Sequence, residues 1–241
     1  MKEIEIVKNK KILIKYLDKK IELSNEEQKL IDEYWETLPK FFTRGNVFCV
    51  TNIENQKEEI NITVGNTDYA HYIYVRRHPQ KIKNCFNLWA GILLETLDGK
   101  YIFGKMSDIT ASVGEYHISG GTCDKKEIEN GYINYEKSMY RELKEEMGLC
   151  ENDLNDVRVK FLKLPSETEE DFGILYKAIV NKTSLEMDCY FKEFLKKLET
   201  EGGEIEFTEL KYIDKRIESI DEFAQNNIIN KYAIEMMKKD I

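Results

Sequence analysis

The sequence has few of the residues that mark secreted, disulfide-rich or zinc-binding proteins. Its 241 residues include only three prolines and three histidines, and its five cysteines form no Cys-x-x-Cys pair. An odd number of cysteines spread evenly along a chain disfavours a disulfide framework and a structural zinc site. We therefore expect reduced thiols that mostly pack in the interior.

The chain also lacks long apolar runs and an excess of positive charge. Leu88–Leu94 is far shorter than the roughly 20 residues that span a bilayer, and Met1–Glu5 lacks the apolar stretch of a signal peptide. The 36 Lys and Arg against 45 Asp and Glu give a charge of −9, which disfavours nucleic acid as a partner. With 41% hydrophobic and 34% charged residues, the composition predicts a folded cytoplasmic protein without membrane contact.

Residues 1–84 alternate strand and helix signals and predict a small α+β lobe. Strand-like runs at 3–7, 11–16, 46–51 and 59–64 flank one helix. Ser24 and Glu27 have the spacing of a capping box at its start, and Pro39 follows its end. The apolar residues between them recur at spacings of three and four, which predicts one buried face: Leu30, Ile31, Tyr34, Trp35 and Leu38.

Residues 85–241 predict a second domain of the α/β (α+β) class. Strands are expected at 88–96, 101–106, 115–119, 157–164, 172–180 and 207–213, with Asp98-Gly99 as a hairpin turn. Helices are expected at 134–147, 186–199 and 228–238, and Gly148 ends the first of them. Strands before and after a central helix predict an α/β/α sandwich with a mixed sheet, preceded by the N-terminal lobe.

One helix carries a cluster of carboxylates that favours metal binding. Glu142, Glu145 and Glu146 share a helix face, where like charges repel one another. Such a cluster becomes favourable when a hard divalent cation such as Mg²⁺ or Mn²⁺ neutralises it. Arg141 adjoins the cluster and can pair with a neighbouring carboxylate through its planar fork.

The same segment resembles the Nudix box, Gly-x5-Glu-x7-Arg-Glu-U-x-Glu-Glu-x-Gly-U, where U is a bulky aliphatic residue. Arg141–Leu149 matches the whole second half, while Gly121 and Glu127 match the first Gly-x5-Glu. Thirteen residues instead of seven separate Glu127 from Arg141, so six extra residues precede the helix around 128–135. Had the insertion fallen earlier, Ile133 would hold the position of the supporting glutamate.

The resemblance implies a Nudix pyrophosphohydrolase that cleaves the phosphoanhydride of a nucleoside diphosphate linked to another moiety. It implies Mg²⁺ or Mn²⁺ held by Glu142, Glu145, Glu146 and the Gly120 carbonyl, with Arg141 orienting a glutamate. The general base is Glu146, Glu204 or Glu206, since the family recruits it from different places. Lys105, at the end of a strand, is the candidate phosphate contact.

The resemblance also suggests a nucleotide sugar or ADP-ribose as substrate. Val64–Tyr72 looks like the Gly-x-Thr-Asp-Tyr stretch of a UDP-glucose/UDP-galactose diphosphatase-like branch, and Pro165 has a spacing that resembles ADP-ribose-cleaving members. Arg76 is a second candidate phosphate contact. The candidates for stacking on a base are Tyr69, Tyr72, Tyr74 and Trp89.

Other readings of the segment remain. A Nudix-like sensor module would bind a nucleotide metabolite without cleaving it, although such modules typically lose box glutamates that are present here. Removal of diphosphate from RNA 5′ ends would favour a basic surface, which the net charge opposes. An isopentenyl-diphosphate isomerase would need a cysteine in an Asn-x-x-Cys-x-His-Pro setting, which Cys85 does not have. The acidic segment 166–171 predicts a charged turn, with a metal-facing loop as the alternative. The front lobe implies a homodimer by analogy with the family.

Overall fold

The computed structural model describes residues 4–8, 10–40, 42–79, 81–165 and 171–241. The N-terminal part contributes β1 (Ile4–Ile6), β2 (Lys11–Lys20), α1 (Asn25–Trp35), β3 (Asn46–Asn55), β4 (Glu59–Asp68) and α2 (Tyr69–Arg77). The next elements are β5 (Asn87–Glu95), β6 (Lys100–Met106), β7 (Tyr116–His117), β8 (Ser119–Thr122), β9 (Ile128–Glu129), β10 (Tyr132–Ile133) and α3 (Tyr135–Met147). The last are β11 (Leu154–Lys163), β12 (Asp171–Val180), α4 (Ser184–Glu201), β13 (Phe207–Asp214), α5 (Ile217–Asn226) and α6 (Lys231–Asp240).

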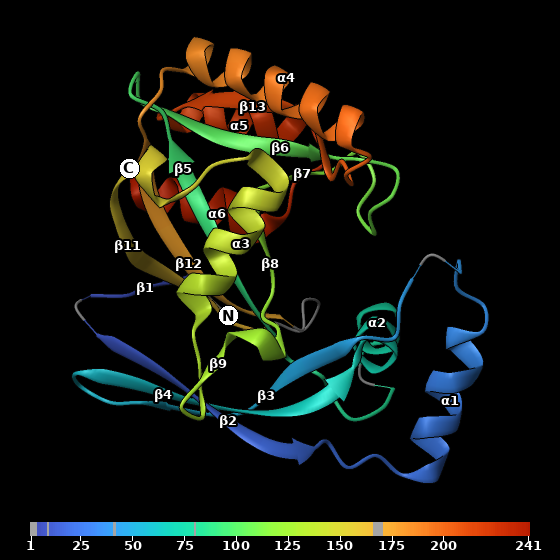
Figure 1. The fold of residues 1–241 in the computed structure, drawn as a ribbon. Helices are drawn as coiled ribbons and strands as arrows, with labels where there is room; N and C mark the ends of the chain where they lie inside the picture. Colours follow the sequence, from blue (N-terminus) through green and yellow to red (C-terminus); the bar gives the residue numbers. More distant parts are fainter. Residues whose placement is uncertain (1–3, 9, 41, 80, 166–170) are drawn as a thin grey trace.

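One mixed sheet runs through both parts of the chain. Its main path has the order β1-β11-β12-β5-β3-β4-β2-β10-β9, while β6 and β8 pair with β5, and β7 and β13 pair with β6. The β5–β12 and β2–β4 pairs are parallel, whereas β5 pairs with β3, β6 and β8 antiparallel. Figure 1 shows β2, β3 and β4 forming the lower part of the molecule, beside α1 and α2.

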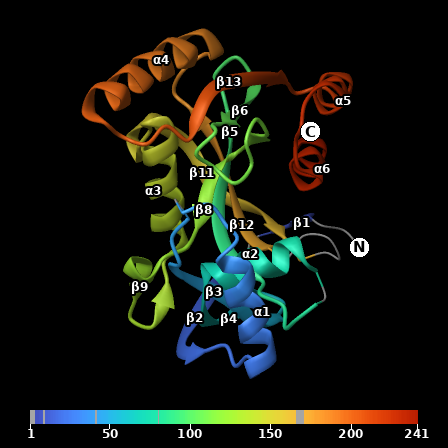
Figure 2. The same ribbon diagram turned by 90° about the vertical axis from the view of Figure 1, so that its right-hand side faces the viewer.

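Helices cover both faces of the upper strands. In Figure 2, α3 and α4 lie on one side of β5, β11 and β12, and α5 and α6 lie on the other. The first face forms a core that also takes in apolar residues of β2, β3 and β4, and the second face forms a separate core under α5 and α6. This arrangement confirms the predicted mixed α/β class with helices on both faces.

The predicted domain boundary at residues 84 and 85 stays a prediction. The chain passes there from α2 into β5, but β1 from the first segment pairs with β11 in the second. Cys49 of β3 is the direct strand partner of Asn87 in β5, so the sheet continues across the boundary.

Local signals placed most elements correctly, and tertiary packing explains the exceptions. The capping box forms, because Ser24 Oγ accepts from the Glu27 N–H and Glu27 accepts from the Ser24 N–H. Ile31 is fully buried as predicted, but Leu30 is 39% exposed, because α1 covers only one edge of the lobe. Helices α2 and α5 were not predicted. Cys49, Cys85 and Cys123 are buried, whereas Cys150 and Cys189 are exposed.

The six extra residues before α3 form the β9–β10 hairpin. Asn130 and Gly131 take positive φ angles of 51° and 81° at its turn, as two-residue hairpin turns require. Tyr132 pairs with Lys15 of β2, so the hairpin extends the sheet at the edge of the N-terminal lobe. At its base, the Asn134 N–H donates to the Glu127 carbonyl at 2.8 Å. The insertion therefore loops out between Glu127 and α3 without separating them.

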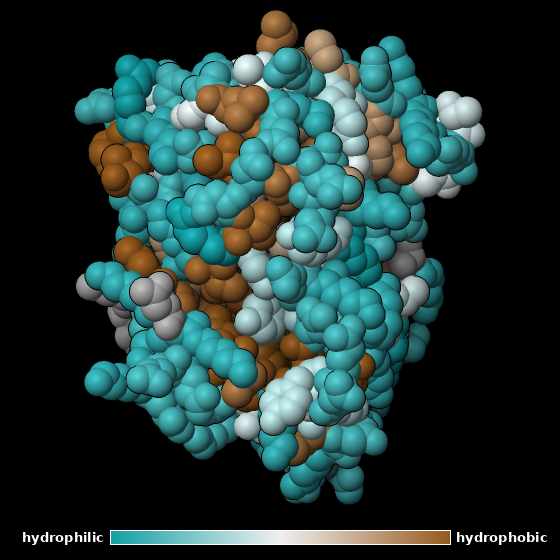
Figure 3. All heavy atoms as spheres, turned by 60° about the vertical axis from the view of Figure 1, so that its left-hand side comes forward, coloured by the Kyte–Doolittle hydropathy of each residue, from teal (hydrophilic) through white to brown (hydrophobic). Residues whose placement is uncertain are grey.

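Within the described residues, no helix combines the length and the apolar character needed to cross a bilayer. On the face drawn in Figure 3, hydrophilic residues cover most of the surface, and apolar residues gather in a hollow at mid-height.

The hairpin turn gives a first prediction. Gly131→Ala should lower the free energy of unfolding by about 1 kcal/mol, because alanine is strained at a positive φ. A methyl group at Gly131 would meet no atom within 4 Å, so only backbone strain is tested. Gly45 is equally unobstructed but has no positive φ, so Gly45→Ala is the matched control in urea unfolding. Equal stabilities of the two variants would contradict the proposed turn.

Candidate functional site

Helix α3 presents its carboxylates toward β8. The Asn134 side chain caps the first turn by accepting from the Lys137 N–H, and Gly148 ends the helix in the left-handed conformation. Three apolar side chains anchor the helix in the core: Met139, Leu143 and Met147. On the neighbouring positions, Glu142 and Glu146 are buried, whereas the Glu145 side chain is half exposed.

Arg141 connects the helix, the turn before the hairpin and β8. Its Nε donates to Glu127 at 2.8 Å, and Glu127 is only 1% exposed. Its Nη1 donates to Glu142 at 2.6 Å and to Glu145 at 3.1 Å, and its Nη2 donates to the Thr122 carbonyl at 3.1 Å. Glu127 thus holds the arginine that organises the carboxylates. The structure places Ile133, the alternative for this position, in the apolar core instead.

The two glycines before the insertion allow β8 to approach these carboxylates. The Gly120 N–H donates to Glu146 Oε2 at 2.9 Å. A Cβ on Gly121 would lie 2.4 Å from Glu142 Oε1, so any other residue would push the carboxylate away. Gly120 has a φ of 153° and leaves no room for a Cβ against the Ala90 carbonyl. Gly-Gly is therefore a steric requirement of the site.

Burial shifts the proton equilibria of the cluster. It raises the pKa of Glu142 to about 7, with the charges of Glu145 and Glu206 acting in the same direction against Arg141. Burial also raises the pKa of Glu146 well above its ordinary range, helped by Glu142 and Glu206. The pKa of Glu206 rises through burial and the charges of Glu145 and Glu204. One guanidinium does not balance this concentration of carboxylates.

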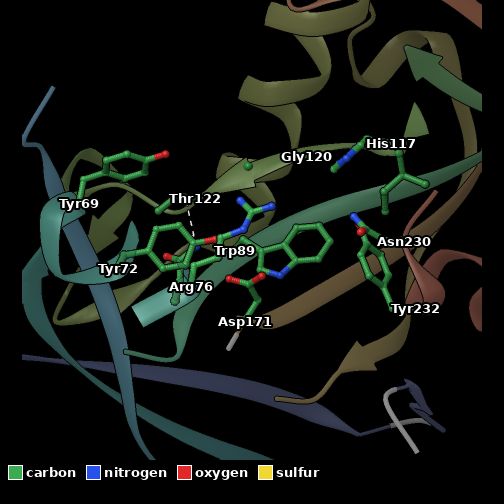
Figure 4. A pocket seen from close by; sticks show the side chains of 13 residues that line it. Tyr69, Tyr72, Arg76, Trp89, His117, Gly120, Thr122, Asp171, Asn230 and Tyr232 are labelled. Carbon is green, nitrogen blue, oxygen red and sulfur yellow. Dashed lines mark hydrogen bonds between the residues drawn. The ribbon is translucent and has the colours of Figure 1, made fainter. Parts of the chain in front are cut away.

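A cavity of about 220 Å³ lies beside β8. Figure 4 shows that helix α2 of the N-terminal part supplies one wall, with Tyr69, Tyr72 and Arg76. The opposite walls come from β5, β8 and the starts of β12 and α6, with these side chains: Asn87, Trp89, Thr122, Asp171, Asn230 and Tyr232. The backbone of Gly120 and Gly121 also borders the space.

A second cavity of about 360 Å³ shares Tyr69 and Arg76 with the first. It is lined by the loop 109–112 and by Glu204 and Glu206. Arg76 therefore borders both the cavity beside β8 and the space next to the carboxylates. Among the described residues that line these two cavities, Arg76 alone carries a permanent positive charge.

No family model and no curated protein matches the chain at a significant level. Solved structures do match. DR0079 from Deinococcus radiodurans aligns with a TM-score of 0.51 at 14% identity, over 80% of this chain and 98% of that one. The MutT protein from Methanosarcina mazei aligns at 0.43 and 12% identity, over 65% and 94% of the two chains. A Nudix-family hydrolase from Clostridium perfringens aligns at 0.38 and 15%, over 63% and 93%.

The fold is that of the Nudix hydrolases. The predicted fold class is thereby confirmed, and α3 is the helix that carries the residues resembling the second half of the Nudix box.

The structure brings most of the predicted site residues together, but not all. Gly120, Arg141 and the three helix glutamates form one cluster, and Glu204 and Arg76 line the adjoining cavity. Lys105 lines neither cavity: its Nζ lies 3.8 Å from Glu209 and 6.0 Å from the centre of the Tyr116 ring. Tyr74 packs against Tyr34 in another apolar cluster.

The sequence analysis missed Asn87 and Asp171 as cavity residues. Asp171 was considered only as part of the acidic segment 166–171, of which residues 166–170 lie outside the described residues. No local motif marks Asn87 or Asp171, because their shared position arises from the pairing of β5 with β12.

The donor chemistry of the cluster fits the metal that a Nudix hydrolase implies, because hard divalent cations prefer carboxylate oxygens. In the part of the chain that the structure describes, however, no three acidic, histidine or cysteine side chains already converge on one point. The guanidinium of Arg141 is the cation that bridges Glu142 and Glu145.

The buried pair gives a stability prediction. Glu127→Ala should lower the free energy of unfolding by about 3–5 kcal/mol, because it leaves the Arg141 guanidinium without its buried partner. Glu129→Ala is the control, since Glu129 is exposed and its carboxylate bonds only to the side chains of Lys137 and Asn134 among the described residues; an exposed pair of this kind is worth about 0–1 kcal/mol. Chemical denaturation measures both. A similar loss in the two variants would show that Glu127 does not hold the arginine.

The raised pKa of Glu142 gives a pH prediction. The pKa of Glu142 is near 4.5 in the unfolded chain and about 7 in the folded protein. Between these two pH values, the carboxyl group is ionised in the unfolded chain but protonated in the folded protein. Its contribution to stability is therefore complete below 4.5 and is lost as the pH rises to 7. In EDTA, the free energy of unfolding of Glu142→Gln should fall less over this range than that of the unmodified protein. Parallel pH profiles would contradict the assigned burial.

Proposed function

We propose that this chain is a divalent-metal-dependent hydrolase that cleaves the phosphoanhydride of a nucleoside diphosphate linked to another moiety. The observation that carries the proposal is the carboxylate cluster on α3, organised by the Glu127–Arg141 pair. Burial and mutual repulsion of the carboxylates reduce the stability of the fold. Clusters of this kind recur at catalytic sites, where the reaction needs the negative charge.

Glu142, Glu145 and Glu146, with the carbonyl of Gly120, would hold Mg²⁺ or Mn²⁺. The metal would supply charge neutralisation for the diphosphate and acidify the attacking water. Arg141 acts through the glutamates: its fork fixes Glu142 and Glu145 and leaves Glu146 to the Gly120 N–H. We therefore assign Arg141 a positioning role.

The water that attacks phosphorus must lose a proton as the bond to the bridging oxygen breaks. Of the three candidate bases, Glu206 fits this task best, because its partly buried carboxyl group lines the cavity next to the helix glutamates. Glu204 is exposed and adds its negative charge to Glu206, and Glu146 is occupied by the Gly120 N–H. The products would be a nucleoside monophosphate and the phosphorylated second moiety.

Arg76 is the better of the two candidate phosphate contacts. It borders both cavities and comes from the N-terminal part, whereas Lys105 is already paired with Glu209. A nucleotide sugar or ADP-ribose remains the proposed substrate. Tyr69, Tyr72 and Trp89, three of the four proposed stacking residues, line one cavity.

One observation supports a second function, in which the protein binds a nucleotide metabolite without cleaving it. The Arg141 guanidinium occupies carboxylate oxygens that a metal would need. Turnover distinguishes the two functions, because a binding module would leave every substrate intact.

Glu145→Gln and Glu146→Gln should each reduce turnover by at least about a hundredfold, because each removes charge from the proposed metal site. The assay follows release of nucleoside monophosphate from UDP-glucose, ADP-ribose, NADH, diadenosine polyphosphates and nucleoside triphosphates, with Mg²⁺ or Mn²⁺ and with EDTA. Glu136→Gln, on the exposed first turn of α3, is the matched control.

Thermal unfolding with and without Mn²⁺ gives an independent readout. The metal should stabilise the unmodified protein and the Glu136 variant, and should stabilise the Glu145 and Glu146 variants less. Near-normal turnover in both of the latter would overturn the ligand assignment. A lack of turnover with every substrate, while one of them raises the melting temperature, would favour the binding module.

A further inference from the structure

The inner end of the cavity beside β8 holds two oxygen atoms without a hydrogen-bond partner. Asn87 is only 3% exposed, and its Nδ2 donates to Thr122 Oγ1 at 3.1 Å. Its Oδ1 is buried and has no partner among the described residues. Asp171 Oδ1 is likewise buried and has no hydrogen-bond partner among the described residues. Because buried polar atoms are nearly always paired in folded proteins, these two acceptors are suited to hydrogen-bond donors of a ligand.

The sheet places the two acceptors side by side. Asn87 begins β5, Asp171 begins β12, and the two residues are direct partners in the parallel pairing of these strands. Side chains of paired residues lie on the same face of a sheet. Both residues line the cavity, and the Asn87 amide is fixed by Thr122 with its oxygen free.

The surroundings of this pair select against a phosphate and for a neutral group. The amide oxygen of Asn87 and the carboxylate oxygen of Asp171 only accept hydrogen bonds, and an ionised phosphate offers only acceptors, so a phosphate would leave both atoms unpaired. Trp89 and Tyr72 provide apolar ring surface on the walls (Figure 4). Arg76 lines both cavities, and its guanidinium also interacts with the charge of Asp171.

The size of the cavity points the same way. At about 220 Å³ it is smaller than the roughly 300–1,000 Å³ of sites that enclose a whole drug-sized ligand. It therefore suits one moiety of a larger molecule whose remainder lies outside. A nucleobase edge offers acceptors as well as donors, whereas every hydroxyl of a sugar can donate to an acceptor.

We propose that this cavity binds the sugar of a nucleoside diphosphate sugar, with Asn87 Oδ1 and Asp171 accepting from its hydroxyl groups and Arg76 contacting the diphosphate. The inference rests on the proposed function and narrows it. It makes Asn87 and Asp171 specificity residues, and it disfavours nucleoside triphosphates, which end in a phosphate.

The test isolates the sugar by comparing ligands with and without it. Calorimetry in Mg²⁺ would measure the affinity of α,β-methylene ADP-ribose against α,β-methylene ADP, and of α,β-methylene UDP-glucose against α,β-methylene UDP. These analogues keep the charge but lack the bond that hydrolysis would cut. In at least one of these two ligand pairs, the unmodified protein should bind the sugar-bearing analogue more tightly than the plain diphosphate. Asn87→Ala should reduce this difference in affinity about tenfold.

Asp171→Asn is the second variant. Because the two side chains are nearly isosteric, this variant should fold even if Asn87→Ala does not. It should reduce the sugar-dependent increase by at least fivefold. Asn52→Ala, at an exposed position of β3, is the control and should leave both affinities unchanged. Equal losses for the sugar-bearing ligand and the plain diphosphate would place the base or the diphosphate in the cavity and overturn the proposal.

The outcomes separate this inference from the proposed function. Hydrolysis of a nucleotide sugar by a protein whose Asn87 and Asp171 variants keep the full sugar-dependent affinity would refute the sugar site and leave the hydrolase standing. A loss of that affinity in a protein that hydrolyses nothing would support the sugar site and refute the hydrolase.

Discussion

The arrangement of the site depends on the buried ion pair between Glu127 and Arg141. Glu127 precedes the hairpin, Arg141 lies in α3, and the same guanidinium reaches the Thr122 carbonyl of β8. One side chain thereby fixes three segments that the six-residue insertion could have separated. The hairpin leaves its two ends in contact through the Asn134 N–H and the Glu127 carbonyl. The pair acts together with the Gly120 N–H bond to Glu146 and the apolar side of α3, which also hold the helix against β8.

The single guanidinium of this pair offsets only part of the negative charge that the carboxylates of the site would carry. Three buried or half-buried carboxylates, Glu142, Glu146 and Glu206, have raised pKa values because burial and mutual repulsion oppose their ionisation. The surrounding protein must offset this cost through packing. It does so through an apolar core that extends from α3 and α4 to the strands of the N-terminal part. Local instability of this kind is expected where function, not folding, selects the residues.

The N-terminal part shapes the space in which a ligand would lie. Because β3 continues the sheet from β5, helix α2 lies where Tyr69, Tyr72 and Arg76 face β8 (Figure 1, Figure 4). The Nudix fold supplies the carboxylates, and the N-terminal part supplies the aromatic wall and the cation. The candidate site is therefore a property of the whole chain.

Features that depend on neighbouring residues could be read from the sequence. The capping box at Ser24 marks the start of α1, and the clustered glutamates and Gly148 mark α3; all of these follow from short spacings. Other features needed the tertiary structure. The sequence left open whether Glu127 or Ile133 supports Arg141, ranked Lys105 above Arg76, and gave no sign that Asn87 meets Asp171. Each of these depends on which distant strands pair and on how a hairpin folds back, and such contacts leave no periodic pattern in the chain. The sequence thus determined the chemistry of the cluster, and the tertiary structure decided which residues surround it.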